Sequence, residues 1–565
     1  MSTHRDPPRT CDLGLVMAGA VSAGAYTAGV VDFLVQALDC WEAARGDDRL
    51  APPHRLRLRA LTGASAGAMT AGILAGIAAG REHRPVSRFD PGEDLPDNPL
   101  FDSWVNRIDV RNLLSTGDLD GSGSDRLLSL LNGDVLADIA SAALPAGAGG
   151  RRKPWLADEL LMALTVTNLR GVPYNIGFAD SGNPDQPRAG HGMRRHADQL
   201  RFRLSGTDPG ADADPGQPPG CIALDAGMNG PGWRRLQLAA LASGAFPLLL
   251  PPRWISRDSR DYLAQRWPGA GSGKVVDGHC DCVRYRSLAP DWGEHEPPEQ
   301  FQFHAVDGGM LDNQPFTAGR ELLTGLPPTP PAAPVVSRVM LAIDPFPDLV
   351  SYRQQEPEPA GLLDFGLALL SAMKNQTRFK PEELLTAAED AYASRQLIAP
   401  SRRIDGVPMD HPLAGGAIEG FAGFIDRRFR LHDFWLGRAN CQRFFGRHFR
   451  LPAEHPLFAD WSPQQRQAWR DDDGRLPVLP LLGAAAEPIA TPTWPTIGAE
   501  QMDQLSALLR QRSLALLPHA IDHLLARSNR WMRWATLHMA RWQSRGWVQA
   551  LADQIADQLR RRGQL

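Results

Sequence analysis

"LTGASAGAMTAGILAGIAAG" (residues 61–80) decides between two folds. Its G-x-S-x-G core would place Ser65 as a nucleophile on a tight turn between a strand and a helix. The same uncharged stretch has the length of about 20 residues that a membrane-spanning helix needs. Gly72, Gly76 and Gly80 also have the spacing of packed membrane helices. The two interpretations predict different proteins.

The neighbouring residues favour the turn. Before it, "RLRLRAL" (residues 55–61) alternates charged and apolar side chains, which is typical of a strand. Gly63 and Gly67 suit a tight turn, because larger side chains there would collide with the neighbouring backbone. A single G-x-S-x-G is a weak signal in a chain with 54 glycines. The interpretation therefore depends on other groups that would meet Ser65.

Two further stretches supply such groups. "MAGAVSAGAYTAGV" (residues 17–30) predicts a turn that exposes backbone N–H groups at a helix N-terminus, where an oxyanion would be stabilised. In "AVDGGMLDNQP" (residues 305–315), Asp307 ends an apolar strand and two glycines let the chain turn. Functional groups gather at the carboxyl ends of strands in α/β sheets. We therefore expect hydrogen-bond donors, a nucleophile and a carboxylate to meet at one edge.

Strand-like and helical patterns alternate along the chain up to about residue 345. This alternation predicts an α/β fold, in which helices cover both faces of a mainly parallel central sheet. The later residues form long helical patterns separated by loops. We therefore predict an α/β domain over residues 12–345 and an α-helical C-terminal region of open role over residues 346–565.

Four blocks in this order carry a family resemblance: "AGAVSAG" (18–24), "GASAG" (63–67), "LASGAFPLLLPP" (241–252) and "DGG" (307–309). In these blocks the chain resembles the patatin-like phospholipase family, in a bacterial form with an extra helical C-terminal region. The resemblance covers residues 12–345 and implies a three-layer α/β/α domain.

The resemblance also implies an activity, that of a metal-independent acyl hydrolase of the lipase or phospholipase type, cleaving carboxylic esters of lipids. Ser65 would be the nucleophile and Asp307 the general base of a Ser-Asp dyad without histidine. No cofactor is implied. The implied oxyanion hole consists of Gly19, Ala20 and Val21, and the implied supports of the elbow and loops are Gly24, Gly63, Gly67, Gly308 and Gly309.

The oxyanion loop departs from the family pattern, which commonly reads G-G-G-x-R-G. Ala20 and Val21 stand at the second and third glycine positions, and Ala23 stands at the arginine position. Backbone donors survive these replacements, but a β-branched valine cannot adopt a positive φ without strain. A second hypothesis is therefore a catalytically silent patatin-fold module that binds lipid or a partner.

Histidine and metal chemistry are the chemical alternatives. His304 lies three residues before Asp307, so strand alternation puts it on the opposite face, as a structural histidine. His411 and His432, in the C-terminal region, stay open as bases. The segment "HCDC" (residues 279–282) has no second ligand pair nearby, so we expect a loop and no metal site there.

Charge and cysteine content indicate which partners the protein binds and in which cellular compartment it lies. A net charge of −4 gives no general attraction to nucleic acid, so we expect no nucleic-acid partner. Six scattered cysteines indicate free thiols in a reducing compartment. "LGLVMAGAVSAGAYTAGVV" (residues 13–31) resembles a signal peptide, yet a strand, turn and helix explain it equally well. We expect a cytoplasmic protein that acts on a lipid ester, with peripheral membrane contact left open. A membrane-anchored protein with helices near residues 13–31 and 61–80 is the third hypothesis.

Two segments of the C-terminal region combine aromatic and basic residues. For residues 426–449 we predict a core helix whose arginines are solvated or paired with Asp426 and Asp433, and a membrane-surface helix is the alternative. The tail spaces Trp547, Leu551, Ile555 and Leu559 by one helical turn each, which predicts an apolar face for core packing or self-association. Its remaining tryptophans, which keep an interfacial role open, are Trp531, Trp534 and Trp542.

Overall fold

Nine strands form one mainly parallel sheet in the computed structural model, which describes residues 9–45, 51–86, 92, 94–119, 127–177, 190–205, 220–263, 266–270, 275–276, 279–280, 283–324, 338–347, 365, 372, 395–525 and 530–565. The order is β13-β12-β1-β2-β3-β11-β6, and β4 pairs with both β3 and β5. Neighbours from β13 to β3 are parallel, whereas β11 is antiparallel to β3 and β6. The strands of this sheet are β1 (Thr10–Met17), β2 (Arg55–Gly63), β3 (Leu156–Gly177), β4 (Gly190–Ser205), β5 (Cys221–Leu224), β6 (Arg253–Asp258), β11 (Gln300–Asp307), β12 (Arg338–Ile343) and β13 (Arg395–Ile398).

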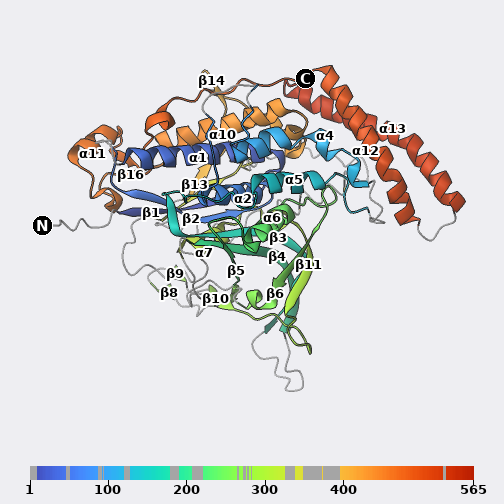
Figure 1. The fold of residues 1–565 in the computed structure, drawn as a ribbon, viewed down its shortest axis with the longest axis horizontal. Coiled ribbons are helices and arrows are strands. Elements are labelled where there is room, and N and C mark those ends of the chain that lie inside the picture. The colour runs from blue at the N-terminus through green and yellow to red at the C-terminus, as the bar shows by residue number, and fades with distance from the viewer. Residues whose placement is uncertain are drawn as a thin grey trace.

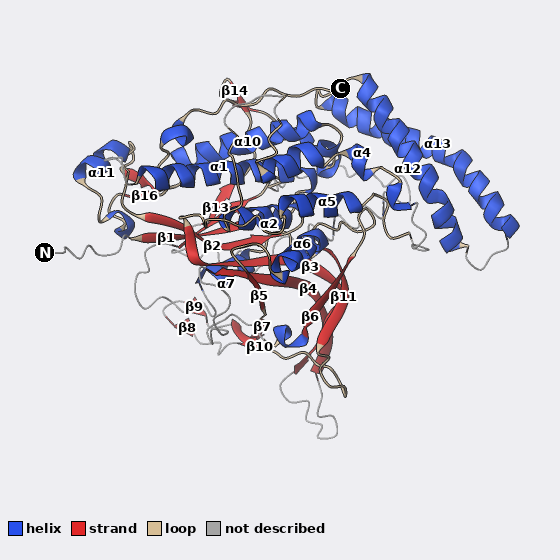
Figure 2. Ribbon diagram, in the orientation of Figure 1, coloured by secondary structure: helices blue, strands red, loops and turns tan. Residues whose placement is uncertain are grey.

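Helices cover both faces of the sheet (Figure 1, Figure 2). On one face lie α1 and α2, with α10 packed along α1, and α7 covers the other face. The predicted three-layer α/β/α arrangement with a helical C-terminal region is confirmed. The helices are α1 (Gly24–Ala44), α2 (Ala66–Ala78), α3 (Pro99–Phe101), α4 (Val110–Leu113), α5 (Asp134–Ala143), α6 (Pro231–Ser243), α7 (Phe316–Thr324), α10 (Arg427–Arg447), α11 (Pro463–Trp469), α12 (Ala499–Leu524) and α13 (Arg530–Arg561). Short two-stranded pairs are β7 (Arg266–Ala270) with β10 (Val283–Ser287), β8 (Val275–Val276) with β9 (His279–Cys280), β14 (Arg403–Ile404) with β15 (Val407–Pro408), and β16 (Arg450–Pro452) with β17 (Arg475–Pro477).

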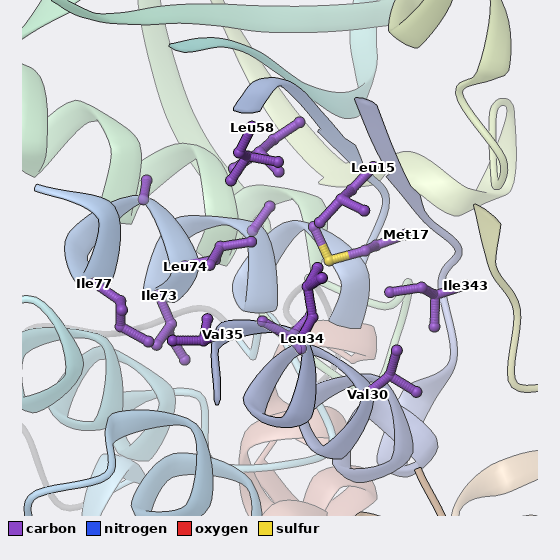
Figure 3. Close-up of a cluster of buried hydrophobic side chains, with 14 of the residues drawn as sticks. Leu15, Met17, Val30, Leu34, Val35, Leu58, Ile73, Leu74, Ile77 and Ile343 are labelled. Atoms are coloured by element: carbon purple, nitrogen blue, oxygen red, sulfur yellow. The ribbon is translucent and has the colours of Figure 1, made fainter. Parts of the chain in front are cut away.

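The core is built from alternating side chains of the central strands. Leu15 and Met17 of β1 belong to the cluster between the sheet and helices α1 and α2, together with Leu34 and Leu74 (Figure 3). Val16 points to the opposite face and packs in the cluster under α7. Because successive side chains of a strand point to opposite faces, β1 supplies both apolar layers.

Residues 61–80 comprise the end of a strand, a turn and a helix. β2 ends at Gly63, and α2 spans Ala66–Ala78, which is shorter than the roughly 20 residues of a membrane-spanning helix. Among the described residues, one helical stretch, Val21–Ala44, is long and apolar enough to span a membrane, and 89% of its most apolar window is buried inside the molecule. Residues 13–31 likewise divide into the end of β1, a turn and the start of α1. The turn interpretation is therefore the one that the structure bears out.

Helix α10 fills the core, as predicted for its aromatic side chains. The backbones of α1 and α10 touch, because a Cβ atom on Gly437 would lie 2.2 Å from the Tyr26 carbonyl oxygen. The predicted partners of its arginines were wrong for two of them. Arg430 is buried against Asp109 at 3.1 Å, and Arg438 is buried against Asp32. Buried cations need such anionic partners, which come here from distant parts of the chain.

The proposed division near residue 345 stays a prediction, but the two regions share structure. Strand β13 pairs in parallel with β12 and so extends the sheet beyond that residue. The His54 imidazole, just before β2, lies between the Trp461 indole N–H, at 3.1 Å, and the Val478 carbonyl oxygen, at 2.9 Å. The C-terminal region therefore contributes to the sheet and to the main core.

Helices α12 and α13 form a hairpin that projects from the body of the molecule (Figure 1). The inner end of the hairpin is anchored in an apolar cluster that contains Ile555 and Leu559 of α13. The predicted apolar stripe is buried only over this part, because Trp547 is 73% exposed and Leu551 is 44% exposed. Core packing therefore accounts for half of the stripe.

Candidate functional site

Ser65 occupies the turn between β2 and α2. Its φ of 51° and ψ of −122° place a non-glycine residue in a sparsely populated backbone region, which is common where a side chain must be held for function. The two glycines of the motif permit the turn. A Cβ on Gly63 would lie 2.6 Å from the Gly67 backbone, and a Cβ on Gly67 would lie 2.2 Å from the Met17 carbonyl oxygen. The predicted reason for these glycines is confirmed.

Asp307 ends β11 next to Ser65. The Ser65 hydroxyl donates a 2.7 Å hydrogen bond to the Asp307 Oδ2 atom, and both residues are buried. The other carboxylate oxygen, Oδ1, accepts a 2.7 Å hydrogen bond from the Gly309 N–H. The Thr167 hydroxyl holds the Asp307 carbonyl at 2.7 Å. The sequence-predicted serine and carboxylate are therefore brought together with geometry suited to proton transfer.

The predicted oxyanion loop lies against Ser65, since a Cβ on Gly19 would be 3.1 Å from the Ser65 Cβ. Val21 has a φ of 51°, which is the strained conformation expected of valine at a glycine position. The Gly19 N–H donates to the Asn313 carbonyl at 3.3 Å. No hydrogen bond to the described part of the chain is recorded for the backbone N–H groups of Ala20 and Val21. Of the three predicted donors, these two are the ones left for an oxyanion.

The other predicted supports lie around this loop and the aspartate. Gly24 begins α1 against the Trp104 ring, where a Cβ would lie 2.2 Å from the indole. Gly308 packs against the Thr165 carbonyl, 2.2 Å from where its Cβ would be. Both positions therefore require the absence of a side chain.

Two polar residues that sequence reasoning did not assign also hold the site. The Ser243 hydroxyl, fully buried at the end of α6, accepts a 2.8 Å hydrogen bond from the Ser65 N–H. The Asn313 backbone carbonyl accepts a hydrogen bond from the Gly19 N–H, and the Asn313 side-chain amide donates one to the Gly19 carbonyl at 3.4 Å. The only sequence signals were their places in "LASGAFPLLLPP" and in "DGGMLDNQP". Both fix the backbone around Ser65 and Gly19.

An apolar cavity opens beside Ser65 and Asp307. Met69 and Trp104 form part of its wall, and a second apolar cavity shares both of them and continues between α2, α5 and α6. Phe421 and Phe424, from the C-terminal region, close another side of the first cavity. Nothing in the local sequence around these phenylalanines indicated such a role.

Residues 413–425, which we call the roof segment, are fastened to the oxyanion loop by one side chain. The Ser22 hydroxyl donates to the Gly420 carbonyl and accepts a 3.1 Å hydrogen bond from the Gly423 N–H. The Asp433 carboxylate of α10 accepts hydrogen bonds from the Ala414 and Gly415 N–H groups, at 2.7 and 2.9 Å. Helix α10 thus positions the roof segment over the cavity.

Comparison with known proteins places the chain in a family. No family model matches it. "Uncharacterized protein y4iI" of Sinorhizobium fredii (strain NBRC 101917 / NGR234) is 33% identical over 556 residues, which cover 90% of this chain and 76% of that protein. The chain belongs to the y4iI family. The crystal structure of VipD from Legionella pneumophila aligns with 99% of this chain and 95% of its own, at 11% identity and a TM-score of 0.17, which is too low to indicate a shared fold.

In this y4iI-family chain the candidate histidines lie away from the dyad. His304 is exposed on β11, with its ring 4.6 Å from that of Trp254, so the predicted opposite face is confirmed. His432 is buried in α10 and hydrogen-bonded to Asp433 at 2.9 Å, and His411 is exposed. Neither residue lines the cavity at Ser65.

No group of three or more potential metal ligands occurs among the residues that the structure describes. The "HCDC" segment lies partly outside the described residues, since only His279 and Cys280 of it, as strand β9, are described.

Proposed function

We propose that this protein is a serine acyl hydrolase of the patatin-like type, which cleaves carboxylic esters of lipids with Ser65 as nucleophile and Asp307 as general base. The observation that carries this proposal is the 2.7 Å hydrogen bond from the Ser65 hydroxyl to the Asp307 carboxylate. A serine hydroxyl becomes an effective nucleophile when an adjacent base accepts its proton.

The proposed reaction has two balanced steps. The Ser65 Oγ atom attacks the ester carbonyl carbon while its proton passes to Asp307, and the alcohol leaves with that proton, which gives an acyl-serine. A water molecule then loses a proton to Asp307 and attacks the acyl-serine carbonyl carbon, and the bond to Ser65 Oγ breaks as Asp307 returns that proton to Oγ, which releases the acid and restores Ser65. The N–H groups of Ala20 and Val21 are the proposed oxyanion donors, a role in which one donor is typically worth about 10²- to 10³-fold in rate.

The apolar walls support a lipid acyl chain as the group that the dyad transfers. The cavity at Ser65 and the cavity beyond it share Met69, Trp104, Ile108 and Leu136, so a chain that enters beside the serine meets continuous apolar surface. Aliphatic chains gain about 0.8 kcal/mol for each CH₂ group buried on such surface. We assign no metal and no cofactor to this reaction.

Hydrolysis and covalent labelling together test the proposal. The purified full chain, in EDTA, is assayed on an aryl ester series and on phospholipid vesicles, and is labelled with a fluorophosphonate probe that reacts with activated serines. We expect Ser65→Ala to abolish labelling and Asp307→Asn to lower turnover by at least about 10³-fold. The control, Ser256→Ala, changes an exposed serine on β6 and should leave both readouts intact. Activity that persists in Ser65→Ala would refute the assignment.

A silent lipid-binding module is the competing function, and one observation favours it. Val21 holds a strained φ of 51° in the loop that would carry the oxyanion donors, where the family pattern has glycine. If the natural chain neither labels nor hydrolyses any ester but binds fatty acid with affinity that Met69→Trp abolishes, this second function replaces the first.

A further inference from the structure

The outer part of the α12–α13 hairpin exposes large aromatic side chains. Trp531 is 74% exposed and Trp534 is 57% exposed, close to the outer end of α13, and Met539 follows at 62%. Trp547, sixteen residues after Trp531, is 73% exposed on the opposite side of the helix. Such residues are normally buried, and a group of exposed ones marks a surface that meets something apolar.

The same part of α13 is purely basic. Residues 530–552 contain four arginines and no aspartate or glutamate. Arg541 and Arg545 are exposed, and no ion pair is recorded for either within the described chain. Arg560, at the opposite end of the helix, lies beyond the acidic residues Asp553 and Asp557. Positive charge is therefore concentrated where the tryptophans are.

The inner end of the hairpin holds it to the catalytic region. The Gln558 side chain accepts a 2.8 Å hydrogen bond from the Ile418 N–H of the roof segment. Gln564, just beyond α13, donates a 2.9 Å hydrogen bond to the Ala414 carbonyl of the same segment. One helix therefore joins the exposed tryptophans to the roof of the cavity.

We propose that the outer part of this hairpin, residues 530–547, docks on an anionic lipid bilayer. Tryptophan favours the interface between headgroups and acyl chains, because its ring is apolar and its N–H remains hydrogen-bonded. Arginine pairs with lipid phosphates and is attracted by anionic headgroups. Charge also favours a lipid surface over a second copy of this chain, because Arg541 and Arg545 of two copies would repel each other, although Arg533 is paired with the exposed Asp522 of α12 at 3.7 Å. This inference concerns binding and does not depend on the proposed catalysis.

Vesicle co-sedimentation of the full chain tests the docking. The experiment uses the Ser65→Ala protein, so that no lipid is hydrolysed, with vesicles of phosphatidylcholine alone and of an equimolar mixture with phosphatidylserine. We expect binding to the mixed vesicles and little to the neutral ones. Arg541→Glu with Arg545→Glu should weaken this binding by at least about tenfold. Trp531→Ala with Trp534→Ala should weaken binding to the mixed vesicles to a similar degree.

Two matched controls separate docking from general effects. Trp254→Ala removes a 51% exposed tryptophan from β6, and Arg560→Glu reverses an exposed charge at the inner end of α13; both should bind as the parent does. Circular dichroism verifies that each variant is folded. The proposal is overturned if the parent does not bind anionic vesicles, or if both hairpin variants bind as tightly as the controls. It is also overturned if these variants instead dissolve a dimer seen by light scattering, since the occupant would then be a second copy.

Discussion

The Ser22 hydroxyl is hydrogen-bonded to the Gly423 N–H at 3.1 Å, so the proposed oxyanion loop and the roof segment are held by one side chain. Ser22 is 1% exposed, and its hydroxyl also donates to the Gly420 carbonyl. The wall of the cavity and the loop that would stabilise the oxyanion therefore cannot move independently.

Replacing Ser22 by alanine should damage both stability and turnover. The buried Gly420 carbonyl and Gly423 N–H lose their partner, which costs about 1–3 kcal/mol of unfolding free energy. Displacement of the loop should lower kcat for ester hydrolysis by about 10- to 100-fold. Urea unfolding and steady-state kinetics measure the two effects. Unchanged kcat in a folded Ser22→Ala protein would show that the roof segment does not position the loop.

Replacing Val21 by glycine should leave the protein more stable than replacing it by alanine, which is the reverse of the usual order. At an ordinary buried position, glycine is less stable than alanine by about 0.5–1 kcal/mol. At a φ of 51° the order should reverse, so that Val21→Gly exceeds Val21→Ala in unfolding free energy by about 1 kcal/mol. The same pair of substitutions at Val16, in strand β1, should give the ordinary order. Alanine being the more stable replacement at both sites would show that the loop carries no strain.

Phe421 should influence which acyl chains are accepted. Its ring packs 5.9 Å from that of Phe246, and both line the cavity beside Ser65. Phe421→Ala removes part of the apolar wall, so KM should rise more for long-chain esters than for short ones. Each 1.4 kcal/mol of lost contact with the acyl chain corresponds to a rise in KM of about tenfold. Fluorophosphonate labelling of Ser65 should persist. An equal change for all chain lengths would place the acyl chain elsewhere.

Acid should destabilise the protein through His54. Burial lowers the pKa of His54 to about 4, from the ordinary 6.5. The Trp461 indole N–H donates a hydrogen bond to the His54 Nδ1 atom. Protonation of Nδ1 would place its new N–H against the indole N–H, so that two donors would face each other. As the pH falls, His54 is protonated in the unfolded state before it is protonated in the folded state. The contribution of neutral His54 to the unfolding free energy is therefore complete above pH 6.5, and roughly 3 kcal/mol of it is lost as the pH falls toward 4. Urea unfolding from pH 7 to pH 4.5 measures this slope.

His54→Gln provides the comparison, since an amide can bond to both neighbours and does not titrate in this range. The variant should lose less stability than the natural chain between pH 6.5 and pH 4.5. Part of the slope will remain, because burial also lowers the pKa of His83, to about 3. Identical slopes in the two proteins would exclude His54 as a source of acid sensitivity.

Local signals predicted that Ser65 and Asp307 would lie at one edge of the sheet, and the family resemblance implied that they would act as a dyad. Ser65 lies in a short motif, Asp307 ends an apolar strand, and the carboxyl ends of strands meet at one edge of an α/β sheet. The strain at Val21 was equally local, since it follows from a valine at a glycine position. In each case a few adjacent residues determine the backbone, so no distant contact had to be known.

The roof segment could not be predicted in this way. Gly423 meets Ser22 across 401 positions of the chain, and only the packing of α10 along α1 brings them together. The partner of Arg438 was missed for the same reason, because Asp32 belongs to α1 and is distant in sequence. Long-range partners depend on how helices pack, which single-sequence periodicity does not specify.

Helix α1 depends for its burial on segments that are synthesised far later. In the finished protein its apolar window, with a mean hydropathy of 1.3, is 89% buried, and α10 supplies part of that cover. At about 5–20 residues per second, a ribosome needs on the order of tens of seconds to pass from α1 to α10. Throughout that interval the face of α1 that α10 covers in the finished protein is without its partner. A face that is core in the finished protein is therefore apolar surface on the nascent chain, which is the kind of surface that chaperones bind.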